Sequence, residues 1–160
     1  MEPLTRIAVV IGSFVVSCLT AAVVFVLCFQ APTVLAGLQS PDVATLDLLR
    51  GFTWVTITVW PVVMAIAILP VGLAIAYAES IARRSIWYFL SVWVVIALVP
   101  TVPTVVADTA RRGQYLVAAL TIAVLVVAGM AGGLVYWALA GRSSGNWHRR
   151  GPPREEPPPA

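Results

Sequence analysis

The sequence predicts an all-α protein, an integral membrane bundle of four transmembrane helices. Three observations predict this class: 60% of the 160 residues are apolar, only 11% are charged, and the mean hydropathy is +0.94. An average globular chain carries about 25% charged residues. The composition therefore excludes a nucleic-acid-binding domain and argues strongly against a soluble enzyme.

Each predicted span is a long window without an acidic, a basic or a histidine residue. A membrane-spanning helix needs roughly 20 mostly apolar residues. Four windows meet this requirement, and they cover residues 7–29, 52–78, 86–107 and 115–140. Because a backbone in lipid has to satisfy its own hydrogen bonds, we expect each window to be a helix. Residues 1–140 are thus expected to form a four-helix transmembrane domain, with a long connection over residues 30–51.

The chain changes composition after residue 140. Residues 141–160 are rich in Pro, Arg, Gly and Ser and end in a run of prolines. Such a segment cannot bury an apolar core, and its composition is typical of disorder or of polyproline II. We expect residues 141–160 to form a disordered tail.

The arginines predict the orientation of the bundle. All ten basic residues are arginine, which together with the Ala, Val and Pro content is typical of a GC-rich bacterial genome. Four spans place both termini on one side, and that side collects seven of the ten: Arg6, Arg83, Arg84, Arg142, Arg149, Arg150 and Arg154. Positive loops favour the cytoplasm. We therefore expect a bacterial cytoplasmic (inner) membrane protein with both termini and the tail in the cytoplasm.

The residues that carry enzyme chemistry are scarce in this chain. One His and two Cys cannot build a zinc cluster, and neither a phosphate loop nor a nucleophile motif occurs. The windows also lack the buried ionisable group that ion and proton transporters use. We expect no catalytic residue, no metal and no cofactor.

This scarcity leads to two expectations about function. The first is a non-enzymatic accessory, assembly or interaction subunit, whose partners are the lipid bilayer and another membrane protein or a second copy. The alternative is a small channel or transporter for an uncharged solute, which would use hydroxyl groups and freed backbone carbonyls.

Small residues recur at helical spacing in two windows. Ser13, Ser17 and Ala21 fall on every fourth position of the first window, and Gly129 and Gly133 form a Gly-x-x-x-Gly pattern in the fourth. Small side chains let helix backbones approach closely in lipid. Two alternatives stay open: these residues pack the helices of one chain together, or they form an interface with a partner or a second copy.

Prolines mark an irregular region in the predicted second and third spans. Pro61 and Pro100 lie at similar depth in the outer half of the bundle, and each removes a backbone hydrogen-bond donor. Threonine hydroxyls lie close by in the sequence, namely those of Thr56, Thr58, Thr101 and Thr104. Either threonines and water repair two kinks, or the region is a shallow polar cavity that opens outward.

One short segment resembles a known group of proteins. Residues 132–142, which read GGLVYWALAGR, resemble the end of small uncharacterised inner-membrane proteins of alphaproteobacteria. The resemblance supports the expected location and implies no function. The four-helix size also resembles the small multidrug-resistance exporters, but those depend on a glutamate in the first helix, and residues 7–29 contain none.

Overall fold

The computed structural model describes residues 3–38, 45–81 and 85–143. These residues form five α-helices and one short 3-10 helix: α1 (Pro3–Leu38), α2 (Thr45–Ser80), α3 (Ile86–Leu98), α4 (Val102–Arg112), α5 (Tyr115–Leu139) and η1 (Gly141–Ser143). No strand occurs within the described ranges, so the predicted all-α class is confirmed. The predicted tail begins with η1, and its remaining residues, 144–160, lie outside the described part of the chain, as do Arg83 and Arg84.

Three helices are each long and apolar enough to cross a membrane. Their apolar stretches are Leu4–Pro32, Leu46–Ala78 and Tyr115–Leu139. α3 and α4 qualify as a fourth only when the two are counted as one bent span. The described chain therefore has three to four helices with the length and composition of membrane spans.

The third predicted window is not one straight helix, which corrects the expectation from the sequence. α3 ends at Leu98, α4 begins at Val102, and the two are bent by 45°. The cause is a pair of prolines one turn apart, because Pro100 and Pro103 have no N–H for the carbonyls of Ile96 and Val99. Two consecutive turns thus lose a hydrogen bond at the α3–α4 break. In α2, Pro61 and Pro70 are nine residues apart, about two and a half turns, so the lost hydrogen bonds are not in consecutive turns and the helix is continuous.

The long connection predicted over residues 30–51 is also largely helical. α1 continues to Leu38 and α2 begins at Thr45, so only residues 39–44 lie between them. Leucine, alanine and arginine in the flanking segments favour a helix even where hydropathy has fallen. Hydropathy marks where a chain can lie in lipid, and helices extend beyond that limit.

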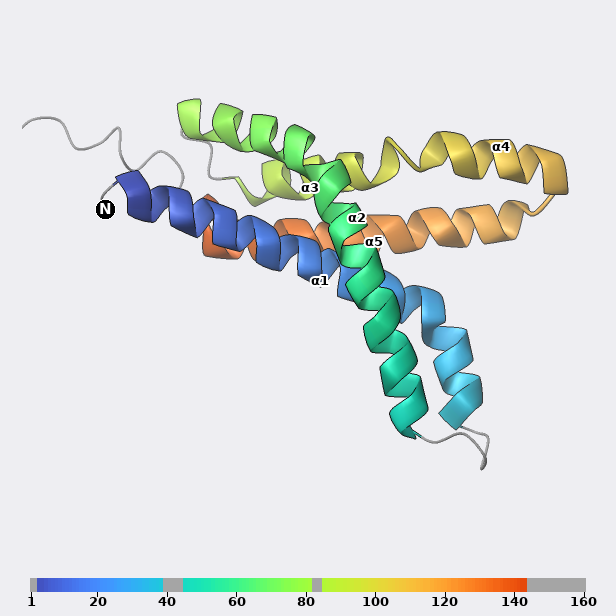
Figure 1. The fold of residues 1–160 in the computed structure, drawn as a ribbon. Helices are drawn as coiled ribbons and strands as arrows, with labels where there is room; N and C mark the ends of the chain where they lie inside the picture. Colours follow the sequence, from blue (N-terminus) through green and yellow to red (C-terminus); the bar gives the residue numbers. More distant parts are fainter. Residues whose placement is uncertain (1–2, 39–44, 82–84, 144–160) are drawn as a thin grey trace, which may run out of the picture.

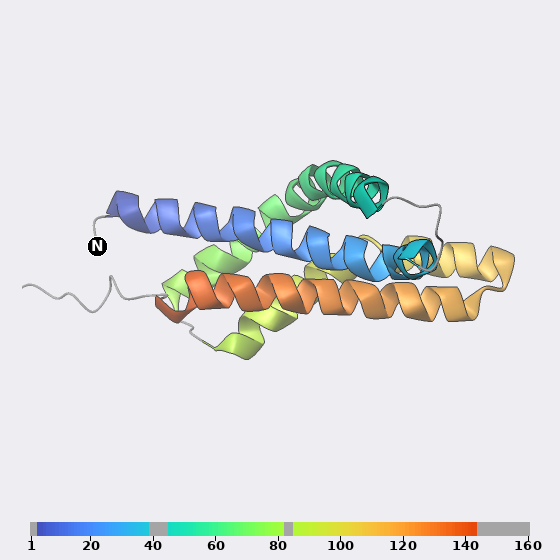
Figure 2. The same ribbon diagram turned by 90° about the horizontal axis from the view of Figure 1, so that it is seen from below.

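α5 lies at the centre of the bundle. α1 and α3 both pack along it, and α2 packs mainly on α1, with a smaller contact to α3. Figures 1 and 2 show α1 and α5 side by side and running in opposite directions. The main buried cluster joins side chains of four helices: Cys18, Ala67, Val71, Ala78, Phe89, Trp93, Tyr136 and Ala140.

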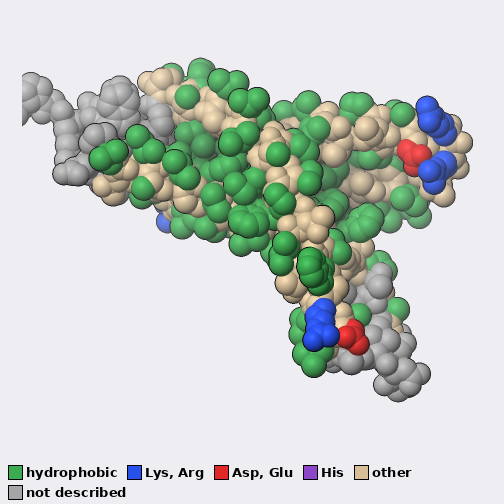
Figure 3. All heavy atoms as spheres, in the orientation of Figure 1, with side chains coloured by type: hydrophobic (Ala, Val, Ile, Leu, Met, Phe, Trp, Pro, Cys, Tyr) green, Lys and Arg blue, Asp and Glu red, His purple; other side chains and the backbone are tan. Residues whose placement is uncertain are grey.

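α2 is the least covered of the long helices. Figure 1 shows that its first part and the end of α1 project away from the layer formed by α3, α4 and α5. Only 11% of its most apolar stretch is buried, against 33% for α1 and 22% for α5. The surface of this projection is largely apolar, and charged side chains gather near its tip (Figure 3).

Candidate functional site

Gly129 and Gly133 of α5 lie directly against the backbone of α3. A Cβ atom added to Gly129 would lie 3.0 Å from the carbonyl oxygen of Trp93. One added to Gly133 would lie 2.9 Å from the carbonyl oxygen of Phe89. Neither position has room for a side chain. Of the two alternatives open from the sequence, this pair serves the contact within the chain.

The small residues of α1 pack against a neighbouring part of the α5 surface, at Gly132. Ser13, Ser17 and Ala21 are all buried. A Cβ atom added to Gly132 would lie 3.2 Å from both the Ala21 Cβ and the Ser17 carbonyl oxygen. The serine hydroxyls donate within α1, Ser13 to Val9 and Ser17 to Ser13, at 2.6 and 2.7 Å. Both small-residue patterns therefore bring α1 and α3 onto α5.

The six residues of the predicted polar cavity do not come together in one pocket. Pro100 and Thr101 line an apolar cavity, and Thr104 lines a separate polar pocket between α4 and α5. Thr56, Thr58 and Pro61 line neither, and of these three only Thr56 is buried. The predicted water-filled cavity stays a prediction.

The threonine hydroxyls near the prolines donate to carbonyls of their own helices. Thr56 donates to Phe52 and Thr58 to Trp54, both at 2.9 Å. Thr104 donates to the Thr101 carbonyl at 2.8 Å. These hydroxyls therefore offer a ligand only their remaining lone pairs.

The apolar cavity has a volume of about 120 Å³ among four helices and is partly open to the surface. α1 contributes Ala21 and Phe25, and α2 contributes Val63, Ile66 and Ala67. α3 and the break after it supply one wall, and α5 supplies the other through Leu125, Ala128 and Gly129. Thr101 is the one lining residue with a polar side chain, and none of the lining residues is charged. This composition suits a neutral, mainly apolar occupant.

The hydrogen bonds at the α3–α4 break explain its shape. The Thr101 N–H donates to the Leu98 carbonyl at 3.1 Å, which is a 3-10 bond and not the α-helical bond to Ala97. The Thr101 hydroxyl takes over the Ala97 carbonyl at 2.6 Å. The hydroxyl thus replaces the bond that the Thr101 N–H would make to Ala97 in an α-helix, and it replaces neither of the two bonds lost to the prolines. The Ile96 carbonyl loses its α-helical donor, because the residue four positions on is Pro100.

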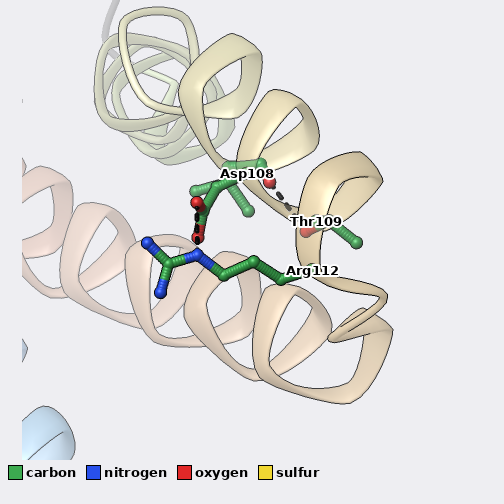
Figure 4. A network of polar contacts seen from close by, with 4 residues as sticks. Asp108, Thr109 and Arg112 are labelled. Carbon is green, nitrogen blue, oxygen red and sulfur yellow. Dashed lines mark hydrogen bonds and ion pairs between the residues drawn. The ribbon is translucent and has the colours of Figure 1, made fainter.

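The polar pocket lies between α4 and α5 near the turn that joins them. Its volume is about 310 Å³, and its polar lining residues are Thr104, Asp108, Thr109, Gln114 and Thr121. Figure 4 shows the Asp108 carboxylate paired with Arg112 one turn later on the same helix, at 2.8 Å. Both side chains are mostly exposed, so this ion pair contributes little to stability.

The start of α1 and the end of α5 meet at the opposite end of the bundle. Arg6 donates to the Ala140 carbonyl at 3.3 Å, across a separation of 134 residues in the sequence. Arg142 lies over the ring of Trp137, with 4.4 Å between its guanidinium carbon and the ring centroid. The first and last helices therefore begin and end at the same end of the molecule.

Sequence reasoning found two residues of the apolar cavity, and the prolines were the signal that located them. Ala21 and Gly129 also line it, and the sequence singled them out as packing residues and not as part of a cavity. The other lining residues occupy ordinary apolar positions of α1, α2, α3 and α5, so no local pattern identifies them. Among the described residues, no group of three or more His, Cys, Asp and Glu side chains lies close enough to hold a metal ion. Comparison of the chain with protein-family models, with curated proteins and with solved structures finds no match.

Proposed function

We propose that this chain is a non-enzymatic subunit that binds another membrane protein through α2. The observation that carries the proposal is the uncovered state of this helix, of which only 11% of the most apolar stretch is buried. The proposal includes a multi-pass arrangement in a bacterial cytoplasmic membrane with both termini in the cytoplasm. The arginine distribution and the meeting of Arg6 with Ala140 support that arrangement.

The exposed surface of α2 has a place where a second helix fits closely. Gly72 and Ala76 are four residues apart, both are exposed, and a Cβ added to Gly72 would meet nothing within 4 Å. Leu69 and Leu73, which flank this notch, are 76% and 73% exposed. Pairs of small residues at this spacing let helix backbones approach in lipid. Gly129 and Gly133 of α5 allow this close packing against α3 within the chain. The surface at Gly72 has no such neighbour, so a helix of a partner can pack there.

A leucine at Gly72 tests the proposal. The Gly72→Leu variant fills the notch, and its Cβ would meet no other atom within 4 Å. Gly12→Leu is the matched control, since Gly12 is an exposed helical glycine of α1 with equally open surroundings. In a mild-detergent pull-down, we expect wild type and Gly12→Leu to retain one partner at fixed stoichiometry and Gly72→Leu to lose it. Equal recovery with all three chains would contradict the role of α2.

A second candidate function is passage of a small uncharged solute. The bent pair α3 and α4 supports it, because helices broken within a membrane expose backbone carbonyls that solutes and ions can use. The test is the flux of small neutral solutes into liposomes that contain the purified chain alone. Flux above that of protein-free liposomes would favour this function, and its absence would leave the interaction subunit.

A further inference from the structure

We infer that Arg142 and Arg6, which meet at one end of the bundle, bind the headgroup of an anionic phospholipid, with Arg142 as the principal contact to its phosphate. The inference concerns a lipid at the ends of α1 and α5, so it does not rest on the partner of α2 or on the solute flux proposed above. Three features of the described residues carry it: the stacking of Arg142 on Trp137, the position of Arg6 at the same end, and the apolar side chains exposed beside them.

The end of α5 fixes the position of the Arg142 guanidinium. The helix ends at Leu139, and the chain then packs so closely at Gly141 that an added Cβ would lie 2.9 Å from the Phe89 ring. The same Cβ would lie 3.1 Å from Cδ1 of Trp137. Arg142 follows directly, and its guanidinium carbon lies 4.4 Å from the centroid of the Trp137 ring. A cation at this distance is attracted to the face of an indole, so the stack holds the exposed Arg142 side chain in place.

The stacked guanidinium keeps its hydrogen-bond donors for a ligand. A guanidinium stacks through its flat face, and its five N–H groups point outward in its own plane, so the contact with Trp137 uses none of them. Within the part of the chain that the structure describes, Arg142 makes no ion pair and no hydrogen bond. Its edge is therefore available for the two parallel hydrogen bonds that arginine makes to a phosphate.

Arg6 adds a second positive charge at this end. Figures 1 and 2 show the start of α1 and the end of α5 at the same end of the bundle. Arg6 donates from Nη2 to the carbonyl of Ala140, two residues before Arg142, at 3.3 Å. The carboxylates whose side chains the structure describes lie elsewhere, Asp47 in the first turn of α2 and Asp108 near the turn between α4 and α5. The described part of this end thus carries positive charge, which attracts an anion.

The neighbouring surface indicates that the anion belongs to a lipid. Ile7, next to Arg6, is 55% exposed, and Leu139, three residues before Arg142, is 51% exposed. Both belong to apolar stretches with the length and composition of membrane spans, and each arginine lies near the end of its stretch. Arginines at such ends extend to the level of the lipid headgroups. A phospholipid satisfies both parts of this surface, because its phosphate contacts the arginines and its acyl chains cover the aliphatic side chains.

The test compares two lipids that have the same acyl chains and different headgroups. Phosphatidylglycerol has a net negative charge and phosphatidylcholine has none. Native mass spectrometry of the full chain in a neutral detergent counts the molecules of each lipid that stay bound during a titration. We expect one phosphatidylglycerol to bind at least about tenfold more tightly than phosphatidylcholine, as hydrogen bonds between charged groups predict. Equal affinity for the two lipids overturns the inference.

Removal of one arginine assigns the binding to this site. Arg142→Gln removes the charge and should abolish the preference for phosphatidylglycerol. Arg111→Gln is the matched control, because Arg111 is an exposed arginine in the last turn of α4, and it should keep the preference of wild type. The arginines of the tail stay in place in both variants. A preference that survives in Arg142→Gln, or that Arg111→Gln also removes, overturns the assignment.

Two further variants test how Arg142 is held and how it binds. Trp137→Leu removes the ring under the guanidinium and should weaken the binding of phosphatidylglycerol. Arg142→Lys keeps the charge but cannot form two parallel hydrogen bonds, so its preference should lie between those of wild type and Arg142→Gln. Wild-type affinity in Trp137→Leu overturns the role of the stack, and wild-type affinity in Arg142→Lys overturns the paired hydrogen bonds.

Soluble anions distinguish a lipid site from a site for free phosphate. Glycerol 3-phosphate has a phosphate without acyl chains, and inorganic phosphate is the anion alone. Neither should displace phosphatidylglycerol at millimolar concentration, because neither covers the exposed side chains of Ile7 and Leu139. Displacement by either anion at a concentration comparable to that of the lipid would identify a soluble ligand and overturn the lipid assignment.

Discussion

Gly133 of α5 and Phe89 of α3 are packed so closely that a Cβ atom on the glycine would lie 2.9 Å from the phenylalanine carbonyl oxygen. The oxygen belongs to the backbone, so it cannot rotate away as a side chain can. Gly129 repeats the contact one turn earlier, where its Cβ would lie 3.0 Å from the Trp93 oxygen. This pair of contacts sets the distance between α3 and α5.

Gly133→Ala and Gly129→Ala should each destabilise the protein. The added methyl group forces two backbones apart, and overpacking of this kind lowers the free energy of unfolding by about 1–3 kcal/mol. Thermal unfolding in detergent measures the effect. Gly72→Ala is the control, because its Cβ would meet nothing within 4 Å, and we expect its midpoint to be unchanged or slightly raised. Equal midpoints for all three variants would show that α3 and α5 do not pack at this distance.

Removing both prolines at the α3–α4 break should straighten the pair. In the double variant Pro100→Ala and Pro103→Ala, the carbonyls of Ile96 and Val99 regain their donors. Straightening a 45° bend should lengthen the distance between Trp87 and Ala110 by about 2–3 Å, at 1.5 Å of rise per residue.

Spin labels at these two positions measure that change. They are introduced as cysteines in a background with Cys18→Ala and Cys28→Ala, and pulsed electron paramagnetic resonance gives the distance. The same labels in the background with its prolines intact supply the reference. An unchanged distance would mean that the bend comes from packing on α5 and not from the prolines.

Both termini should lie in the cytoplasm. Seven of the ten arginines fall on their side of a four-span topology, and Arg6 and Ala140 bring the two ends together. A reporter that is active only in the periplasm should be silent when fused after Ala160. The same reporter fused after Gly113, in the turn between α4 and α5, should be active. Activity at Ala160 and silence at Gly113 would reverse the topology.

Water should reach the pocket between α4 and α5 but not the apolar cavity. Single cysteines in place of Thr109 and Thr121 line the polar pocket, and one in place of Thr101 lines the apolar cavity. In a background without Cys18 and Cys28, a membrane-impermeant thiol reagent added from outside should label the first two and leave the third unreacted.

Cysteines at Thr56 and Thr58 extend this experiment to the polar cavity expected from the sequence. Both hydroxyls donate within α2, and we expect both positions to be protected. Labelling at Thr56, Thr58 or Thr101 would instead establish a water-filled cavity between the second and third spans.

The sequence by itself determined the helical class and the position of the apolar segments. The predicted window 115–140 agrees with α5 (Tyr115–Leu139) to within one residue at its end. The reason is that transfer into lipid depends on the composition of a local segment, which a window along the chain measures directly. Pro100 likewise marked an irregular place, because the loss of an N–H is a property of the residue itself, whereas Pro61, marked in the same way, leaves α2 continuous.

Only the tertiary structure decided which helices meet and what lies between them. A small-residue pattern permits a close approach but does not specify which helix approaches. Gly129 and Gly133 pack against the backbone of α3, while Gly132 lies between the Trp93 side chain of α3 and the backbone of α1. The apolar cavity combines residues from α1, α2, α3 and α5, whose separation in the sequence hides the volume that they line. Whether two prolines bend one span or break it depends on neighbouring hydrogen bonds. Here the Thr101 N–H forms a 3-10 turn with the Leu98 carbonyl, and the Thr101 hydroxyl donates to the Ala97 carbonyl. These outcomes depend on distances between remote residues, which arise only when the helices pack.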